Sequence, residues 1–419
     1  FVALPLCLGI ALASGAPLFS GIIAGIVGGI VVGAASGSRL GVSGPAAGLA
    51  VIVFDAITSL GSWELFLAAV VLAGVFQIAL GFLKAGTIAY FFPTSVITGM
   101  LTGIGLLIVL KQLPYLMGWH ADFLGELSFS QFNGENTLTA IQHAFSALSP
   151  SAIVISVVSL ALLVIWDKYL THQHKAFRLI QGPIVVVLLG IVISVLLAQA
   201  GSPMAAEHLV SLPVLEGPGG LLDELSFPSF AGFLNPDVII VALVMAAVAS
   251  IETLLSVEAT DKLDPDRGNT PTNRELKAQG LGNIVSGMIG GLPITQVIVR
   301  SSANIAFGAK TKLSTIVHGL ILLVCVVAVS GLLNMIPLAS LAAVLVVVGY
   351  KLAKPATFKK LFECGYEQFL PFVTTILVML FTDLLTGVLA GLAISLMFTL
   401  RHSYKNAFDT EEVSCETTG

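Results

Sequence analysis

The sequence has few charged residues. Asp, Glu, Lys and Arg make up 10% of its 419 residues, whereas a soluble domain carries roughly 25%. Hydrophobic residues make up 56% of the chain, and glycine alone occurs 42 times. This composition excludes an ordinary water-soluble domain and predicts a protein of the lipid bilayer. The net charge of −5 indicates little, because in a membrane protein the sign of the charge matters loop by loop.

Cysteine is also scarce, and its placement excludes two common uses. Cys7, Cys325, Cys364 and Cys415 show no paired spacing, so the sequence predicts neither a zinc site nor a disulfide framework. Cys7 and Cys325 lie in apolar runs and are expected to be small core residues. The sequence shows no nucleophile–base pair, metal cluster or phosphate-binding loop. We therefore expect no enzymatic activity, no cofactor and no nucleic-acid partner.

Long apolar runs fill most of the chain. A spanning helix needs about 20 apolar residues, and a broken one can be shorter. The sequence predicts fourteen segments in two sets of seven, with a short segment third in each set. Their approximate bounds are 1–13, 19–36, 45–60, 63–83, 93–113, 151–166, 182–199, 237–258, 275–292, 297–307, 314–333, 337–352, 367–384 and 386–402. The first run opens at Phe1 without an initiator Met, which indicates a trimmed N-terminus rather than a signal peptide.

The distribution of Lys and Arg predicts the orientation of the segments. An odd number of spans inverts the second set relative to the first, and basic residues favour the cytoplasmic side. The connections 113–150 and 200–236 contain acidic residues but no Lys or Arg. Basic residues instead follow the even-numbered segments from the sixth onward, at Lys168, Lys175, Arg178, Lys262, Arg267, Arg274, Lys277, Lys310, Lys312, Lys351, Lys354, Lys359, Lys360, Arg401 and Lys405. A cytoplasmic N-terminus places all of them inside, so both termini are predicted to be cytoplasmic.

Two glycine-rich stretches that contain a proline occupy corresponding places in the two sets. They are residues 41–48 (GVSGPAAG) and 290–302 (GGLPITQVIVRSS). Paired interruptions of this kind indicate the binding site of a transporter. The short helix after each stretch is expected to begin near mid-membrane, where its free amides and its dipole attract an anion. Pro45 suits the first turn of the first such helix.

The predicted anion-binding residues come from these two helix starts. They are Ser43, Gly44, Pro45, Ala46, Gln296, Val297 and Ile298. Ser43 has a hydroxyl and Gln296 an amide that can donate to an anion, and a plain helix cap is the alternative for Ser43. His143 and His318 have no evident partner in the sequence, so each is expected to be a packed or interfacial histidine.

Two charged side chains lie inside apolar segments. Arg300 follows the start of the tenth segment by one turn, and a charge at membrane depth marks a functional site. It is expected to add positive charge to the anion site, with a structural ion pair as the alternative. Glu252 lies in the eighth segment, and Ser256 lies one helical turn further on the same side. Glu252 is expected to pair with Arg300, to carry a coupling proton, or to help Ser256 hold Na⁺.

Several motifs together resemble the SulP family of inorganic anion transporters. They are LPLCLG (4–9), GVSGP (41–45), IETLLS (251–256), QGLGN (279–283) and VRSSAN (299–304). The resemblance implies an all-α polytopic membrane protein with the uracil-permease-like fold, which has fourteen segments in a 7+7 inverted repeat. It also implies homodimers and an elevator movement of a core domain against a gate domain. By that pattern the parts are 1–92 (core, first repeat), 93–200 (gate, first repeat), 201–236 (extracellular or periplasmic loop), 237–334 (core, second repeat), 335–403 (gate, second repeat) and 404–419 (cytoplasmic tail).

The resemblance also implies roles for single residues. Leu6, Cys7 and Ile10 match first-segment residues that line the family's pocket, and Arg300 matches a family arginine. Ser43, Val297 and Ile298 match positions that contact the anion in cyanobacterial bicarbonate transporters, and Glu252 and Ser256 match the Asp and Thr of their Na⁺ site. This chain departs from that Na⁺ site at two places: it has Glu252 where those transporters have Asp, and residues 296–298 are Gln-Val-Ile where those transporters have Gly-Ala-Thr. These departures put Na⁺ coupling in doubt and make H⁺ coupling at least as plausible.

Taken together, these features predict a secondary active transporter of a small inorganic anion in the cell (inner) membrane. Bicarbonate is favoured because similar bacterial members are often found beside carbonic anhydrases, which makes carbonic anhydrase a candidate partner. Proton-coupled sulfate transport and anion exchange are the alternatives. A nucleobase permease or a channel-like protein is more distant. The family's cytoplasmic STAS domain has no counterpart after Arg401, so it was trimmed or this member lacks it.

Overall fold

The structure is a computed structural model of the chain. It describes residues 3–119, 129, 136–170, 182–210, 224–266, 268–328 and 330–415, which we call the described residues. Three of the basic residues used to predict orientation, Lys175, Arg178 and Arg267, lie outside them, as do most acidic residues of the two acidic connections.

Within the described residues, each of the fourteen predicted segments corresponds to helix. The first set comprises α1 (Ala3–Ala13), α2 with η1 and α3 (Leu18–Val27, Gly28–Val32, Gly33–Ala35), η2 with α4 (Ala47–Leu49, Ala50–Leu60), α5 (Trp63–Phe82), α6 (Thr94–Met117), α8 (Pro150–Ile165) and α11 (Gly182–Gln199). The second set comprises α13 (Pro236–Leu263), α14 (Thr272–Met288), α15 (Ile298–Ala306), α16 (Leu313–Ala328), α18 (Leu338–Leu352), α20 (Tyr366–Phe381) and α21 (Leu384–Cys415). The predicted all-α polytopic fold is confirmed.

Short helices connect these segments. They are η3 (Ala85–Phe91), α7 (Thr137–Ser146), η4 (Trp166–Leu170), η5 (Ala206–His208), η6 (Phe230–Leu234), α17 (Ser330–Leu333) and α19 (Pro355–Glu363). Among the described residues, eight helices are long and apolar enough to cross a membrane, and the helices of 313–327 and 366–381 are shorter apolar ones. The broken and short segments depend on their neighbours to satisfy the backbone groups that they leave open.

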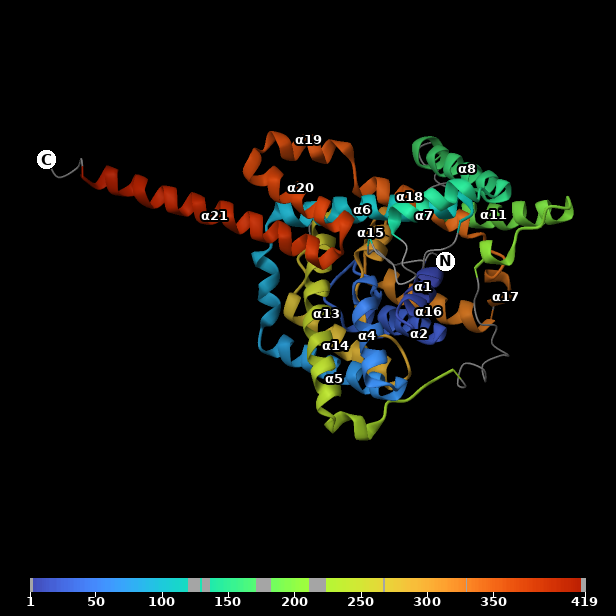
Figure 1. The fold of residues 1–419 in the computed structure, drawn as a ribbon, viewed down its shortest axis with the longest axis horizontal. Helices are drawn as coiled ribbons and strands as arrows, with labels where there is room; N and C mark the ends of the chain where they lie inside the picture. Colours follow the sequence, from blue (N-terminus) through green and yellow to red (C-terminus); the bar gives the residue numbers. More distant parts are fainter. Residues whose placement is uncertain are drawn as a thin grey trace.

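The helices pack in two groups, which Figure 1 shows one above the other. In the lower group α5 packs against α13 and α14, α1 packs against α2, and α16 packs against η1. In the upper group α6 packs against α18 and α20, α20 against α21, and α8 against α11 and α18. The groups meet where α13 contacts α6 and where α15 contacts α18.

Two three-residue strands join the two halves of the chain inside the lower group. Strand β1 (Ser43–Pro45) pairs antiparallel with β2 (Ile294–Gln296), so that Ser43 lies opposite Gln296 and Pro45 opposite Ile294. Both strands are fully buried. The placement of Pro45 in the first turn of a helix was therefore wrong. It ends a strand, and the helical chain resumes only at Ala47.

The last helix is longer than the sequence predicted. We expected a polar tail from residue 404, but α21 continues to Cys415, and Figure 1 shows it projecting from the rest of the molecule. Residues 401–415 contain neither Pro nor Gly, so no helix-breaking residue interrupts the last spanning segment.

Candidate functional site

Each of the paired strands leads directly into the start of a helix. After β2, the first helical hydrogen bond of α15 runs from the Ser301 N–H to the Val297 carbonyl. The amides of Ile298, Val299 and Arg300 precede that bond, so the helix leaves them without an intrahelical acceptor. After β1, the Leu49 N–H donates to the Ala46 carbonyl at the start of η2. Because both starts follow one small sheet, two partially positive helix ends lie beside the same strands.

Polar side chains along α14 hold these strands in place. Glu275, Gln279, Asn283 and Ser286 recur at helical spacing and are almost fully buried. Gln279 Nε2 donates to Ser43 Oγ at 2.7 Å and to Glu275 Oε1 at 3.0 Å. Ser286 Oγ donates to the Leu292 carbonyl at 2.7 Å, just before β2. One helix of the second half therefore positions strands from both halves of the chain.

Asn283 makes the tightest of these contacts. Its Oδ1 accepts from the Ile294 N–H at 2.5 Å, and its Nδ2 donates to the Ile294 carbonyl at 3.1 Å. Nδ2 also donates to Gln77 Oε1 on α5 at 2.6 Å. The sequence analysis missed the positioning role of this row. The signal was present as polar residues at i, i+4 and i+8 in a helix that packs inside the protein.

Arg300 reaches from α15 toward the first half of the chain. Its Nη2 donates to Cys7 Sγ on α1 at 3.2 Å. Its Nη1 lies so close to Gly44 that a Cβ added there would overlap it, and a Cβ at Gly25 would lie 3.7 Å from it. Nη1 is buried and has no hydrogen-bond partner among the described residues. The structure thus brings together Arg300, Cys7 and Gly44, three of the predicted site residues.

No ion pair joins Arg300 to Glu252 within the described part of the chain, where the salt bridges are Arg39–Asp266 and Lys351–Asp167. The expected pairing of Glu252 with Arg300 is therefore not formed in this structure. Arg300 as a whole is only 6% exposed, and no acidic side chain in the described part of the chain forms an ion pair with it. A charge in this setting favours the binding of an anion.

Three predicted donors are already engaged in the protein. The Gln296 side-chain amide donates to Thr260 Oγ1 at 3.0 Å, and the Val297 N–H donates to the Val42 carbonyl at 2.9 Å. Neither group is free to donate to an anion, so these two donor assignments were wrong. Ser43 is not a helix cap, because it lies in β1, but its hydroxyl accepts from Gln279 and retains its own proton to donate.

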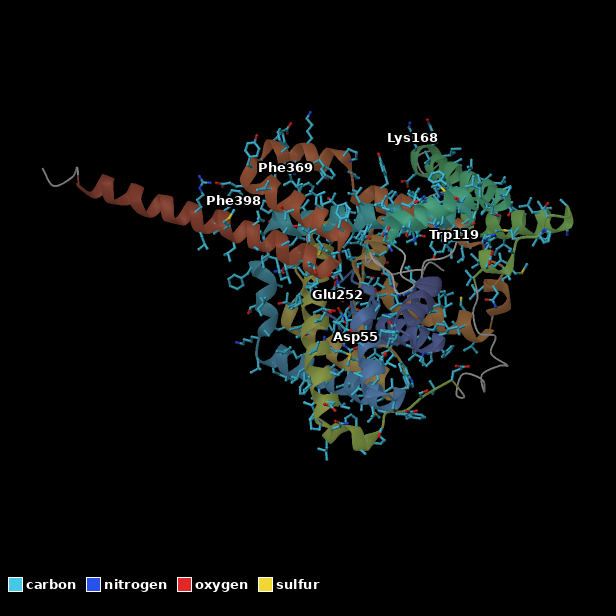
Figure 2. All side chains as sticks on the ribbon, in the orientation of Figure 1. Asp55, Trp119, Lys168, Glu252, Phe369 and Phe398 are labelled. Atoms are coloured by element: carbon cyan, nitrogen blue, oxygen red, sulfur yellow. The ribbon has the colours of Figure 1, made fainter. Side chains whose placement is uncertain are left out.

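Glu252 faces the start of the third segment. A Cβ at Gly48 in η2 would lie 3.1 Å from Glu252 Oε1 and 3.2 Å from Oε2. Figure 2 shows Glu252 on α13 and Asp55 on α4 in the lower group of helices. Glu252 Oε2 is buried without a partner among the described residues. One turn further on, the Ser256 carbonyl accepts from Thr260 Oγ1 at 2.6 Å and from Gln296 Nε2 at 3.4 Å.

A cavity of about 480 Å³ opens beside Arg300. It lies between α1, α15 and α16 of the lower group and α11 of the upper group, and Leu6, Arg300 and His318 are among its lining residues. Cys7 and Ile10 are buried in the main hydrophobic cluster of the lower group. The described residues include no group of three or more His, Cys, Asp or Glu side chains arranged to hold a metal ion.

Comparison with known proteins agrees with this architecture. A profile described as the sulfate permease family matches residues 1–375. The chain is 28% identical to the putative sulfate transporter YvdB of Bacillus subtilis over 409 residues, which cover 96% of this chain and 71% of that protein. It is 28% identical to the bicarbonate transporter BicA of a Picosynechococcus species over 407 residues, 95% of this chain and 68% of that protein. The solved transmembrane domain of a cyanobacterial BicA has a similar fold, with a TM-score of 0.62 and 24% identity over 94% of each chain.

Proposed function

The chain belongs to the sulfate permease family, and on that premise we propose that it is a secondary active transporter of bicarbonate. Membership makes it a multi-pass membrane protein that transports an inorganic anion and is no enzyme. Its relatives are named both as sulfate and as bicarbonate transporters, so the choice of anion depends on the chemistry of this chain.

One observation carries the proposal: within the described residues, the buried Arg300 Nη1 has no hydrogen-bond partner, and it lies beside Gly44, next to two helix starts. A guanidinium donates several hydrogen bonds in a fixed plane and suits a planar oxyanion. The anion would contact this nitrogen, the free amides at the start of α15 and the Ser43 hydroxyl. Gly44, Pro45 and Ala46 would form the wall on the side of the first repeat.

The charge of the site favours a monovalent anion. The described residues that line the cavity include Arg300 but no Lys and no second Arg. A single guanidinium neutralises bicarbonate, whereas sulfate would leave one negative charge in a low-dielectric site. Sulfate therefore fits this site only with an accompanying proton, which makes proton-coupled sulfate transport the second candidate. Anion exchange is the third.

Glu252 is the proposed coupling residue. Its Oε2 is buried without a hydrogen-bond partner, and no cation of the described chain pairs with the carboxyl group, so binding of a cation offsets the cost of its charge. A proton needs only this carboxyl group. Na⁺ needs several oxygen ligands, and the Ser256 carbonyl already accepts two hydrogen bonds. We therefore favour H⁺ over Na⁺ as the coupling ion.

The remaining assignments follow from the family. We propose residence in the cell membrane with both termini cytoplasmic, a homodimer, and association with a carbonic anhydrase that would supply or consume bicarbonate. We assign the lower group of helices to the core domain and the upper group to the gate domain. An elevator movement of the core past the gate would carry the anion across, because the strand pair that holds the site lies wholly in the lower group.

Uptake into proteoliposomes tests the proposal. Labelled bicarbonate and labelled sulfate are offered under an imposed proton gradient or an imposed Na⁺ gradient, with wild type and with Glu252→Gln. Glu64→Gln is the matched control, because Glu64 is an exposed carboxylate at the start of another spanning helix. We expect saturable bicarbonate uptake that a proton gradient drives and that Glu252→Gln uncouples, with no such change in Glu64→Gln.

Other outcomes redirect the proposal. Saturable sulfate uptake without bicarbonate uptake would select the second candidate. Na⁺-driven uptake that Glu252→Gln abolishes would make Glu252 a sodium ligand. Uptake that Glu252→Gln leaves unchanged would reduce Glu252 to a structural residue, and uptake that does not saturate would indicate a channel.

A further inference from the structure

A histidine side chain faces the same cavity as Arg300. His318 lies on α16 and lines the cavity together with Arg300 of α15. Its Nε2 atom is buried and has no hydrogen-bond partner within the described residues. A buried polar atom normally has a partner, so an unpaired nitrogen beside a cavity calls for an explanation. The expectation of a simply packed histidine does not account for it.

Tight packing of α16 fixes where His318 points. Gly319 lies against Gly29 of η1, and a Cβ on Gly319 would lie 2.9 Å from the Gly29 Cα. One turn earlier, Thr315 Oγ1 donates to the Gly41 carbonyl at 3.1 Å, in the loop before β1. One turn later, Leu322 lies beside Gly25, the residue that Arg300 Nη1 also approaches. The helix face that carries His318 is therefore held against the elements that surround Arg300.

The two unpaired nitrogens differ in chemistry. Arg300 only donates hydrogen bonds. An imidazole in its neutral form has one donor nitrogen and one acceptor nitrogen. Together, the guanidinium and the imidazole match an oxyanion that carries a hydroxyl group in addition to its negatively charged oxygens. The guanidinium donates to the negatively charged oxygens, and the imidazole accepts a hydrogen bond from the hydroxyl. Bicarbonate has that hydroxyl, whereas nitrate has the same planar shape and charge but no hydroxyl.

Resting on the proposed function, we propose that His318 is a specificity-determining residue that accepts a hydrogen bond from the hydroxyl of the bound bicarbonate while Arg300 binds its negative oxygens. The site would thus distinguish hydrogen-bearing oxyanions from oxyanions of the same shape without a proton. A site that is built to pair with a hydroxyl rejects the analogue without it, because its own buried polar atom is then left unpaired.

Transport kinetics of His318 variants test this role. The KM for bicarbonate uptake and the inhibition constant of nitrate are measured for wild type, His318→Leu and His318→Gln. His208→Leu is the matched control, since His208 lies on η5 and is not among the residues that line the cavity. We expect His318→Leu to raise the KM for bicarbonate about tenfold, the effect of one lost hydrogen bond. The inhibition constant of nitrate stays unchanged or falls, and His318→Gln restores the KM because its amide oxygen is an acceptor.

Three results would overturn the inference. They are an unchanged KM in His318→Leu, an equal rise of the bicarbonate and nitrate constants, and a glutamine variant that is as impaired as the leucine variant. The last two would show that His318 contributes packing or electrostatic field rather than a hydrogen bond to the hydroxyl. Failure of the proposed function has a different signature, which is wild-type protein that takes up sulfate and no bicarbonate. That result would reject the proposed function and, with it, the role of His318.

Discussion

Replacing Asn283 with alanine removes three hydrogen bonds, of which two tie β2 to α14 and one ties α14 to α5. Two of them join Asn283 to the Ile294 backbone at 2.5 and 3.1 Å, and one joins it to Gln77 at 2.6 Å. Asn283 is 1% exposed, so water does not replace the lost partners. An average hydrogen bond contributes about 1 kcal/mol, and one between membrane helices about 0.6 kcal/mol. Removal of all three hydrogen bonds should therefore lower the free energy of unfolding by about 2 to 3 kcal/mol.

The assay combines thermal unfolding of the purified protein with uptake kinetics. We expect Asn283→Ala to lower the Tm by about 3 °C, because the entropy of unfolding scales with the 419 residues of the chain. We also expect it to raise the KM for the anion, because β2 leads directly into α15 and Arg300. The matched control is Gln77→Leu. It removes the Gln77–Asn283 bond but leaves both bonds from Asn283 to Ile294 intact. It should lower the Tm by a smaller amount and leave the KM unchanged.

Two results would refute this reasoning. A wild-type KM and Tm in Asn283→Ala would show that β2 does not depend on Asn283. An equal rise in KM for Gln77→Leu and Asn283→Ala would show that the effect comes from general loosening between α5 and α14 and not from the anchoring of the strand.

Two further predictions concern the neighbours of β1. Arg300→Gln should weaken anion binding about 30-fold, because a charge-assisted hydrogen bond is lost. The affinity of Arg300→Lys for the anion should lie between those of Arg300→Gln and wild type. Equal uptake KM values for all three proteins would show that Arg300 is not part of the site. Gly28→Ala should lower the yield of folded protein, since its Cβ would overlap the Ser43 carbonyl oxygen. Gly61→Ala is the control, because Gly61 has a φ of 66° but open space around it, so only about 1 kcal/mol of backbone strain is expected, with wild-type uptake. Size-exclusion profiles of the two glycine variants measure the yield of folded protein. A normal profile for Gly28→Ala would contradict the close packing of η1 on β1.

The sequence was sufficient to place the fourteen segments, because bilayer thickness makes length and hydropathy decisive. It also pointed to the 41–48 and 290–302 stretches, since glycine and proline interrupt an otherwise continuous apolar pattern there. Their pairing as strands was not predicted. A three-residue strand is too short to show a periodicity, and its partner lies in the other half of the chain.

The hydrogen bonds of the site depended on contacts between residues distant in sequence. The sequence predicts that the Gln296 side chain and the Val297 amide donate to an anion. In the fold, Thr260 Oγ1 and the Val42 carbonyl accept hydrogen bonds from them instead. The same contacts decide which groups stay free: among the residues described, Arg300 Nη1 has no hydrogen-bond partner, and His318 faces the cavity beside it. None of these partners lies within one helical turn of the residue it contacts, so local patterns contain no information about them.

By itself, the sequence determined that this chain is a polytopic membrane protein of two matching halves with charged residues at membrane depth. Transfer of side chains from water to lipid is a local property, and each residue contributes to it independently of the fold. The tertiary structure alone decided which donors are engaged and which are free, because a hydrogen bond requires two groups within about 3 Å of each other. For Arg300 and His318, that difference is the basis on which we propose a binding site.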